Sequence, residues 1–378
     1  FNIQYRKMLY KRRSFLVIIG SMFGGKIFSL IHNFLIRNKN INIQKQNLNF
    51  LSKVLSVSPS AAASDLPNIL KQEIRVVVIS DLNGEYGTTS YAPEVIKSIS
   101  LIKQWKPDLV LCAGDMIAGQ KYSLTKKQIQ SMWMAFNNNI ALPLKQLKIP
   151  FGFSLGNHDA SGAMYRDQLT FYKERIIASK FWNNSQRNLR LNFIDKSKFP
   201  FYYTFNQNNI FYLVLDASTH IISKEQLTWI EHSLKSLESK QAKLRFVIGH
   251  LPLFPIAVGR NNNGNFIKNG GKLQFLLEKY DVHTYISGHH HAYYPGKKGK
   301  LELLYSGALG GGPRRLLNSK LPPIKTLTVI NISLLLKETK YITYNMNNLE
   351  ILDIKTLPKL IGNVKRKDIS SSKIINTI

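Results

Sequence analysis

The chain has 378 residues, of which 44% are hydrophobic, and it carries a formal net charge of +30 at pH 7. This apolar share is enough for a large core, and no internal repeat divides the sequence, so one main domain with extensions is expected. The only cysteine, Cys112, excludes an intrachain disulfide and is predicted to be a buried thiol.

The positive charge is spread along the whole chain. Residues 1–72 carry eleven basic and one acidic side chains, residues 73–345 carry 35 and 18, and residues 346–378 carry six and three. No five consecutive residues are all basic, and Lys, Asn and Ile are abundant together, as the codon bias of an AT-rich genome produces. The charge therefore permits a nucleic-acid partner without favouring one, although a positive field attracts any phosphate ester.

The first 36 residues have the pattern of an export signal. Arg12 and Arg13 lie in a segment, residues 11–17, that resembles the twin-arginine export motif, and residues 18–25 form an uncharged apolar stretch too short to span a membrane. We expect recognition by the twin-arginine export machinery and a periplasmic location. The alternatives are a membrane anchor that includes the apolar patch 27–36 and a cytoplasmic protein with a basic extension. Residues 37–72 are predicted to be a linker, and cleavage of the signal is left open.

Five apolar runs further along the chain each end in a polar block. Their composition is typical of buried strands, predicted at residues 76–79, 109–111, 151–153, 246–248 and 285–286. Because ligands of open α/β sheets collect outside the carboxyl ends of the strands, the blocks are expected to converge on one point. In chain order they are Asp81-Leu82-Asn83, Gly114-Asp115, Gly156-Asn157-His158-Asp159, Gly249-His250 and Gly288-His289-His290-His291.

Helical spacing of apolar residues separates these strands. It predicts helices over residues 92–105, over 124–147 with a break near Pro143, and from Ser161, as the cap, to 178. A further helix is capped by Ser223, and its buried stripe is predicted to be Leu227, Ile230, Leu234 and Leu237. Strands are also predicted at 211–215, 301–305, 326–332 and 341–344, the last three completing a second sheet. Residues 346–378 are expected to be a loosely held, basic polar tail.

The order of the five blocks resembles that of the calcineurin-like metallophosphoesterase family: D-x-H, G-D, G-N-H-D/E, a lone G-H and G-H-x-H. The resemblance covers roughly residues 73–345 and implies a metallophosphoesterase domain of that extent. It also implies the family's α/β fold, a four-layer αββα sandwich in which two mixed β-sheets lie between helices.

The resemblance further implies a dinuclear centre of two divalent ions, either Mn, Fe or Zn. A hydroxide that bridges the ions is the implied nucleophile. His158 is expected to protonate the leaving alkoxide while Asp159 orients its ring, and His290 is expected to point away. The implied ligands are Asp81, Asn83, Asp115 and His291 for one ion, and Asp115, Asn157, His250 and His289 for the other.

Asn83 departs from the family, which has His at this position. A neutral amide oxygen is a poorer ligand than imidazole for zinc or iron, although harder ions such as manganese tolerate it. Three possibilities are open: Asn83 ligates through its oxygen, it holds a metal-bound water, or the site has lost one metal.

The sequence therefore predicts a metal-dependent phosphoric ester hydrolase that acts on a phosphomonoester or phosphodiester of a small molecule. Residues 84–91, 258–270 and 310–315 are the loops expected to shape specificity, and Arg314 and Arg315 either clamp a phosphate or form an exposed basic turn. One alternative function is a catalytically weakened binding scaffold with the same fold. The other is a nuclease, which requires aromatic and basic side chains interleaved near the metals.

Overall fold

The computed structural model describes residues 73–369. The expected export-signal segment (1–36), the linker (37–72) and the end of the tail (370–378) lie outside these residues, so the expectations about them stay predictions. Within the described range, the structure contains no helix with both the length and the apolar character needed to cross a bilayer.

The first sheet has five strands in the order β14-β13-β1-β2-β3. Strands β1, β2 and β3 are parallel to one another, whereas β13 runs antiparallel to both β1 and β14. The strands are β1 (Glu73–Ile79), β2 (Leu109–Cys112), β3 (Phe151–Phe153), β13 (Thr326–Ser333) and β14 (Glu338–Asn345).

The second sheet has nine strands in the order β15-β16-β11-β12-β10-β9-β8-β7-β6. Its centre, β12, β10, β9 and β8, is parallel, and antiparallel strands flank it on both sides. The strands are β6 (Asn192–Lys198), β7 (Tyr202–Gln207), β8 (Ile210–Val214), β9 (Leu244–Ile248), β10 (Thr284–Ser287), β11 (Tyr294–Lys298), β12 (Leu301–Tyr305), β15 (Leu360–Ile361) and β16 (Val364–Arg366).

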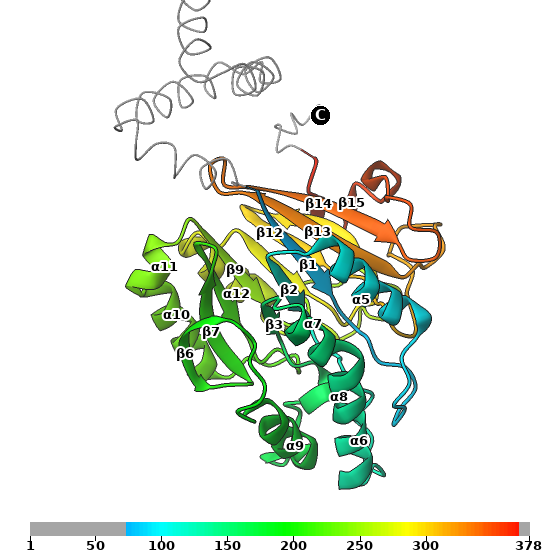
Figure 1. The fold of residues 1–378 in the computed structure, drawn as a ribbon. Coiled ribbons are helices and arrows are strands. Elements are labelled where there is room, and N and C mark those ends of the chain that lie inside the picture. The colour runs from blue at the N-terminus through cyan, green and yellow to red at the C-terminus, as the bar shows by residue number, and fades with distance from the viewer. Residues whose placement is uncertain (1–72, 370–378) are drawn as a thin grey trace, which may run out of the picture. The chain divides into compact units, whose positions relative to one another are not determined.

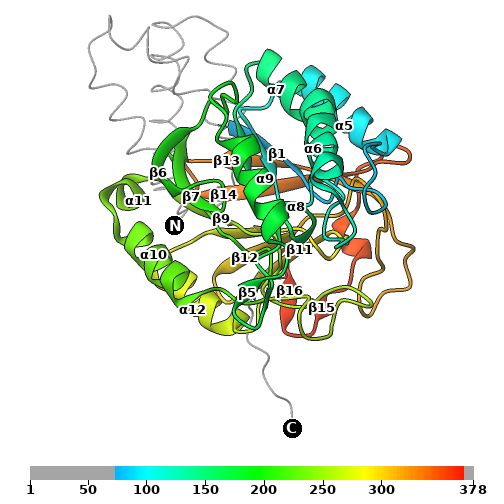
Figure 2. The same ribbon diagram turned by 90° about the horizontal axis from the view of Figure 1, so that it is seen from below.

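Helices cover the outer face of each sheet (Figures 1 and 2). One side carries α5 and the chain α6–η1–α7, in which η1 is a π-helical turn, together with α9; the other side carries α10, α11 and α12. The helices are α5 (Pro93–Trp105), α6 (Lys126–Phe136), η1 (Asn137–Ala141), α7 (Leu142–Gln146), α8 (Asn157–Ala160), α9 (Tyr172–Trp182), α10 (Lys224–Lys235), α11 (Leu237–Gln241), α12 (Gly270–Lys279) and the 3₁₀ turn η2 (Ile354–Thr356).

Three apolar layers hold these elements together. Alternation along β1 illustrates them: Val77 and Ile79 join the cluster between the first sheet and its helices, whereas Val76 and Val78 join the cluster between the two sheets. A third cluster, which includes Ile230, lies between the second sheet and α10 and α12. Helix, sheet, sheet and helix thus follow one another, and the expected four-layer α/β sandwich is confirmed.

Two expectations about helices are wrong. Ser161 does not begin a helix, because its hydroxyl accepts a hydrogen bond from the N–H of Ala163 in a turn; the hairpin β4 (Met164–Tyr165) and β5 (Gln168–Leu169) follows, and α9 begins only at Tyr172. Ser223 does cap α10, accepting from the N–H of Gln226 at 3.1 Å. However, α10 ends before a second cap at Ser236, so Leu237 lies exposed in α11 instead of in the buried stripe, and Leu227 is also exposed.

Two expectations about the C-terminal part are also wrong. The strands at 326–332 and 341–344 were expected in the second sheet, but β13 pairs with β1 and β14 with β13, both in the first. The tail is not loosely held up to residue 369, because β16 pairs with β11 and the side chains of Ile361, Val364 and Arg366 are buried.

The five predicted strand-end blocks do lie at carboxyl ends of parallel strands. The first three follow β1, β2 and β3 of the first sheet, and the last two follow β9 and β10 of the second. Hydrogen bonds between backbone groups and side chains connect the two sets. The backbone N–H of His289 donates to the Asp81 carboxylate at 3.1 Å, and the ring Nδ1 of His250 contacts the carbonyl of Ala113 at 2.8 Å. The two sheets therefore meet at one cluster of polar side chains.

Candidate metal centre

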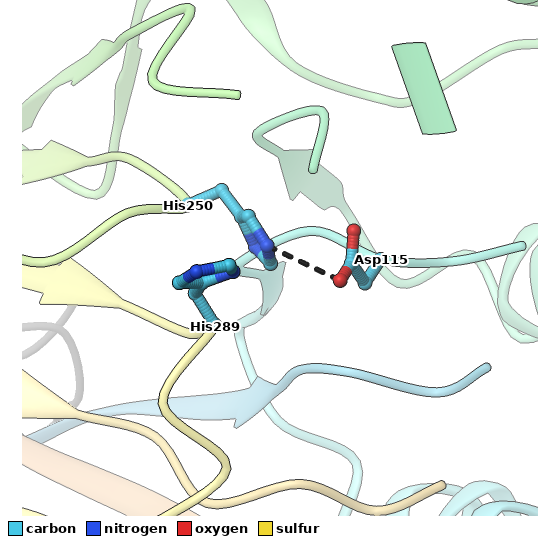
Figure 3. Close-up of side chains that lie close together, drawn as sticks. All are labelled: Asp115, His250 and His289. Atoms are coloured by element: carbon cyan, nitrogen blue, oxygen red, sulfur yellow. Dashed lines mark ion pairs between the residues drawn. The ribbon is translucent and has the colours of Figure 1, made fainter. Parts of the chain in front are cut away.

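Two groups of carboxylate and imidazole side chains lie at this meeting point. In each group, one potential ligand atom per residue lies within 4.8 Å of the others. The first group is Asp115, His250 and His289, which Figure 3 shows with the two imidazoles beside the carboxylate. The second is Asp81, Asp115 and His291. Asp115 belongs to both groups, so a cation in each would share this carboxylate.

Hydrogen bonds orient the first group. The Nδ1–H of His250 donates to the Ala113 carbonyl, which leaves Nε2 directed at Asp115 Oδ2, 3.2 Å away, and at Asn157 Oδ1, 2.9 Å away. The Asn157 amide is held in turn by Gln120, whose Oε1 accepts from Nδ2 at 2.6 Å. Because its nitrogen is engaged, Asn157 presents its oxygen to the group.

The second group is oriented in the same way. The Nδ1–H of His291 donates to the carbonyl of Gly312 at 2.9 Å, so that Nε2 lies 3.2 Å from Asp81 Oδ1. The other carboxylate oxygen of Asp81 accepts from the hydroxyl of Ser80 at 2.6 Å. Ring nitrogens bound to backbone carbonyls are the usual support of metal-ligating histidines.

Asn83 lies beside both groups. Its backbone N–H donates to the carbonyl of Asp115 at 3.2 Å, and the residue as a whole is only 7% exposed. The side-chain Oδ1 is buried and accepts no hydrogen bond within the described part of the chain. A buried oxygen without a donor is costly, and a cation would satisfy it, so this residue fits the place of a ligand.

The backbone at the centre is strained. The residues Asp81, Asp115, His289 and His291 have φ angles of 51°, 55°, 62° and 51°. Non-glycine residues rarely adopt this left-handed conformation, and such strain is concentrated at functional sites. Other turns of the chain, such as that at Asp281, share this conformation, so the strain at the four ligands agrees with a functional site without proving one.

The position before the Asn157-His158 pair has room only for glycine, which is Gly156. A Cβ atom at this position would collide with Asp115 Oδ1 and with its backbone nitrogen. The absence of a side chain lets the turn that carries Asn157 approach Asp115 closely, which brings the first group together.

The charges gathered at the centre shift the pKa values of its titratable side chains. Burial would lower the pKa of His250, but the carboxylates of Asp115 and Asp81 raise it to about 9. Burial would likewise raise the pKa of Asp115, yet the neighbouring His250 and His158 hold it below its usual range. Burial and the surrounding cations keep the pKa of His289 well below its ordinary value, so its ring is neutral. Imidazole nitrogens with carboxylate and amide oxygens form a donor set that suits Mn, Fe or Zn.

We expect divalent metal to bind more weakly as the pH falls. A ligating His250 must lose its proton, and with a pKa of about 9 the metal-free ring is protonated at pH 6 to 8. Each unit of pH below 9 should therefore weaken binding by about tenfold, and binding at pH 7.5 should release about one proton. Calorimetric titration of Mn²⁺ in two buffers of different ionisation enthalpy measures both quantities. Equal affinities at pH 6 and pH 8 would show that metal binding does not displace a proton from His250.

His158 lies beside the groups without joining either. Its Nε2 is 4.0 Å from Asp115 Oδ2, and its ring lies 5.2 Å from that of Tyr86. The expectation that Asp159 orients this ring is wrong: the Asp159 carboxylate accepts from the backbone N–H groups of Met116, Ile117 and Gly156, and so fixes the turn. The ring is oriented by the carbonyl of Gly119, which accepts from Nδ1 at 3.0 Å.

His290 faces away from both groups, as expected. Its Nε2–H donates to the carbonyl of Asn265 at 3.0 Å, and its Nδ1 faces the N–H of Ile256 at 3.4 Å. Burial lowers the pKa of this ring to about 3, so it is neutral. It ties the loop after β9 to the histidine block.

A cavity of about 660 Å³ opens beside the first group. Asn157, His289, Gln120 and Arg260 are part of its wall, and it continues toward the segment 216–226. Gln120 and Arg260 are site residues that the motifs did not reveal. No sequence pattern marks Gln120, and Arg260 is marked only by its place in the loop 258–270, which is expected to shape specificity.

Comparison with known proteins agrees with this site. The sequence model of the calcineurin-like phosphoesterase family matches residues 74–293. No curated protein matches the chain significantly. Purple acid phosphatase PPD1 from seeds of yellow lupin (Lupinus luteus) is 17% identical, with a TM-score of 0.53 over 74% of this chain and 53% of the lupin chain. This chain thus spans about half the length of the lupin protein, and at such identity the likeness concerns the fold.

Two further structures are similar with lower scores. A dimetal phosphatase from Danio rerio is 13% identical, with a TM-score of 0.45 over 68% of this chain and 92% of the fish protein. GAP50, the anchor in the inner membrane complex of Plasmodium, is 14% identical, with a TM-score of 0.47 over 76% of this chain and 91% of that protein.

Proposed function

Because this chain belongs to the calcineurin-like phosphoesterase family, we propose that it hydrolyses a phosphate ester at a centre of two divalent metal ions. The single observation that carries the proposal is the position of Asp115. This buried carboxylate belongs to both groups of potential ligands, and a shared carboxylate is what two neighbouring cations need to screen their repulsion.

The ligands proposed for one ion are Asp81, Asp115, His291 and the unpartnered oxygen of Asn83. Those proposed for the other are Asp115, Asn157, His250 and His289. Ions held by these residues would lower the pKa of a bound water and would neutralise charge on the phosphate oxygens. The chain itself supplies the orientation: Gly312 and Ala113 fix the two imidazole rings through Nδ1.

His158 is the proposed proton donor to the leaving group. A carbonyl can only accept, so the bond to Gly119 places a proton on Nδ1 and leaves Nε2 as the atom that exchanges protons. Nε2 faces Asp115 from outside both groups, at 4.0 Å. The ring is half-buried beside that of Tyr86, so it keeps some access to solvent and could deliver a proton to a leaving alkoxide.

The test is metal removal followed by a substrate panel. After chelation the full chain should lose activity on p-nitrophenyl phosphate and regain it with Mn²⁺, Fe²⁺ or Zn²⁺. Bis(p-nitrophenyl) phosphate, single-stranded DNA and RNA complete the panel and distinguish a nuclease. Activity that survives chelation would contradict a metal-dependent phosphoesterase, and a fully loaded chain that hydrolyses none of the panel would favour the binding scaffold.

A further inference from the structure

Two arginines, Arg260 and Arg314, meet beside the metal centre although 54 positions separate them in the sequence. A short antiparallel pairing joins their loops at Ala257 and Leu316. The N–H of Val258 donates to the carbonyl of Arg315 at 2.9 Å, and this register places Gly259 beside Arg314. A Cβ at Gly259 would lie 3.2 Å from Nη1 of Arg314, so glycine leaves the space that this guanidinium occupies.

Both arginines are tied to the histidines of the centre. Arg260 Nη1 lies 3.5 Å from His289 Nε2 and donates to Asn265 Oδ1 at 2.7 Å. The backbone N–H of Arg314 donates to the carbonyl of His291 at 2.9 Å. Arg260 also lines the 660 Å³ cavity together with His289. Arg260 therefore borders the cavity beside the first group, and Arg314 lies next to the loop that carries Arg260.

Each guanidinium keeps an unsatisfied donor within residues 73–369. The Nε–H of each arginine is buried and has no hydrogen-bond partner there. In the same part of the chain, no carboxylate oxygen lies within 4.0 Å of either side chain. Two neighbouring, half-buried cations without a salt-bridge partner are unfavourable, and an anion between them would lower the cost.

We propose that Arg260 and Arg314 clamp the phosphoryl group of the substrate and thereby make the enzyme selective for phosphomonoesters over phosphodiesters. The proposal rests on the proposed function of the metal centre and adds its substrate class. A monoester carries nearly two negative charges above its second pKa of about 6, and its terminal oxygens match the planar fork of arginine. A diester has one charge, and one of those terminal oxygens carries a second ester group instead.

Arg315 provides a matched control. It neighbours Arg314, but it is exposed, and only its backbone carbonyl joins the two loops. Arg315 is not part of the proposed clamp, so Arg315→Gln should leave phosphate binding and turnover unchanged within about twofold.

The experiment compares Arg260→Gln, Arg314→Gln and Arg315→Gln in the Mn²⁺-loaded full chain. The first two should lower kcat/KM for p-nitrophenyl phosphate by about 10–100-fold, and that for bis(p-nitrophenyl) phosphate by less than about threefold. Metal content should not change. Arg260→Lys should recover only part of the loss, because lysine keeps the charge but not the fork.

Binding of inorganic phosphate to the same proteins separates this proposal from the proposed function, because it needs no turnover. The clamp predicts dissociation constants raised at least about tenfold in both Gln variants and unchanged in Arg315→Gln. The clamp also predicts a higher Tm for phosphate-free Arg260→Gln, since a half-buried cation without a salt-bridge partner is removed, whereas a merely structural arginine would give a lower Tm. Unchanged phosphate affinity in either Gln variant, or equal losses on both esters, would overturn the clamp even if hydrolysis itself is confirmed.

Discussion

Replacing Asp115 by Asn should reduce ester hydrolysis by at least about a thousandfold. Removal of one unit charge about 4 Å from a cation costs on the order of 4 kcal/mol in a partly polar environment, which corresponds to about a thousandfold in rate. The effect should be large because this carboxylate belongs to both ligand groups. The fold should survive: Asn keeps an oxygen that accepts from the N–H of His158, and it tolerates the left-handed φ of 55°.

Metal content and kcat/KM measured on the same preparation check this prediction. Asp281→Asn is the matched control, because Asp281 also has a left-handed φ, 52°, but is exposed beyond the end of α12. Asp281→Asn should melt as the native chain does, whereas metal-free Asp115→Asn should melt at a lower temperature, because His250 loses the carboxylate that raises its pKa, yet it should still unfold cooperatively. Only Asp115→Asn should lose metal. Near-normal turnover with full metal content in Asp115→Asn would refute the shared ligand.

Replacing His158 by Ala should separate proton donation from metal binding. The loss should be about 10²–10⁴-fold for an alkyl phosphate, whose leaving group has a high pKa and needs a proton. For p-nitrophenyl phosphate, whose leaving group departs without a proton, the loss should be within about threefold. Metal content should remain, because the bond from residue 158 to Asp115 Oδ1 comes from the backbone N–H, which Ala retains.

The slope of log kcat/KM against leaving-group pKa is the measurement, and His232→Ala, an exposed site on α10, is the control. The slope should steepen in His158→Ala and stay unchanged in His232→Ala. Parallel losses across the substrate series, or loss of a metal ion, would remove His158 from the role of proton donor.

The sequence was most informative where local pattern and chain order determine structure. Buried strands such as β1 and β2 follow from apolar runs, and the convergence of Asp81, Asp115 and His289 follows from their place after parallel strands. The sheet membership of β13 did not follow, because an alternating strand pairs equally well with either sheet until tertiary packing decides. The helix expected from Ser161 failed for a related reason: a serine hydroxyl stabilises a turn as readily as a helix cap.

Some residues of the candidate site could likewise be predicted from the sequence, and others could not. The spacing of the five motifs predicts where their side chains lie. It does not predict which of these side chains accept hydrogen bonds from the backbone, and for this reason the expected role of Asp159 is wrong. The carbonyl of Gly119, which orients His158 instead, is a backbone atom that no residue type signals. Gln120 and Arg260 reach the centre only through tertiary contacts of their loops, a relation that local pattern does not record.

Electron paramagnetic resonance of the chain reconstituted with two equivalents of Mn²⁺ tests most directly whether two metal ions share Asp115. Two ions that share this carboxylate should give the exchange-coupled signal of a dinuclear Mn(II) centre in the native chain at full activity. In Asp115→Asn the coupled signal should be lost. A fully active native chain that holds one Mn²⁺, or that shows only the six-line spectrum of isolated ions, would contradict the dinuclear centre.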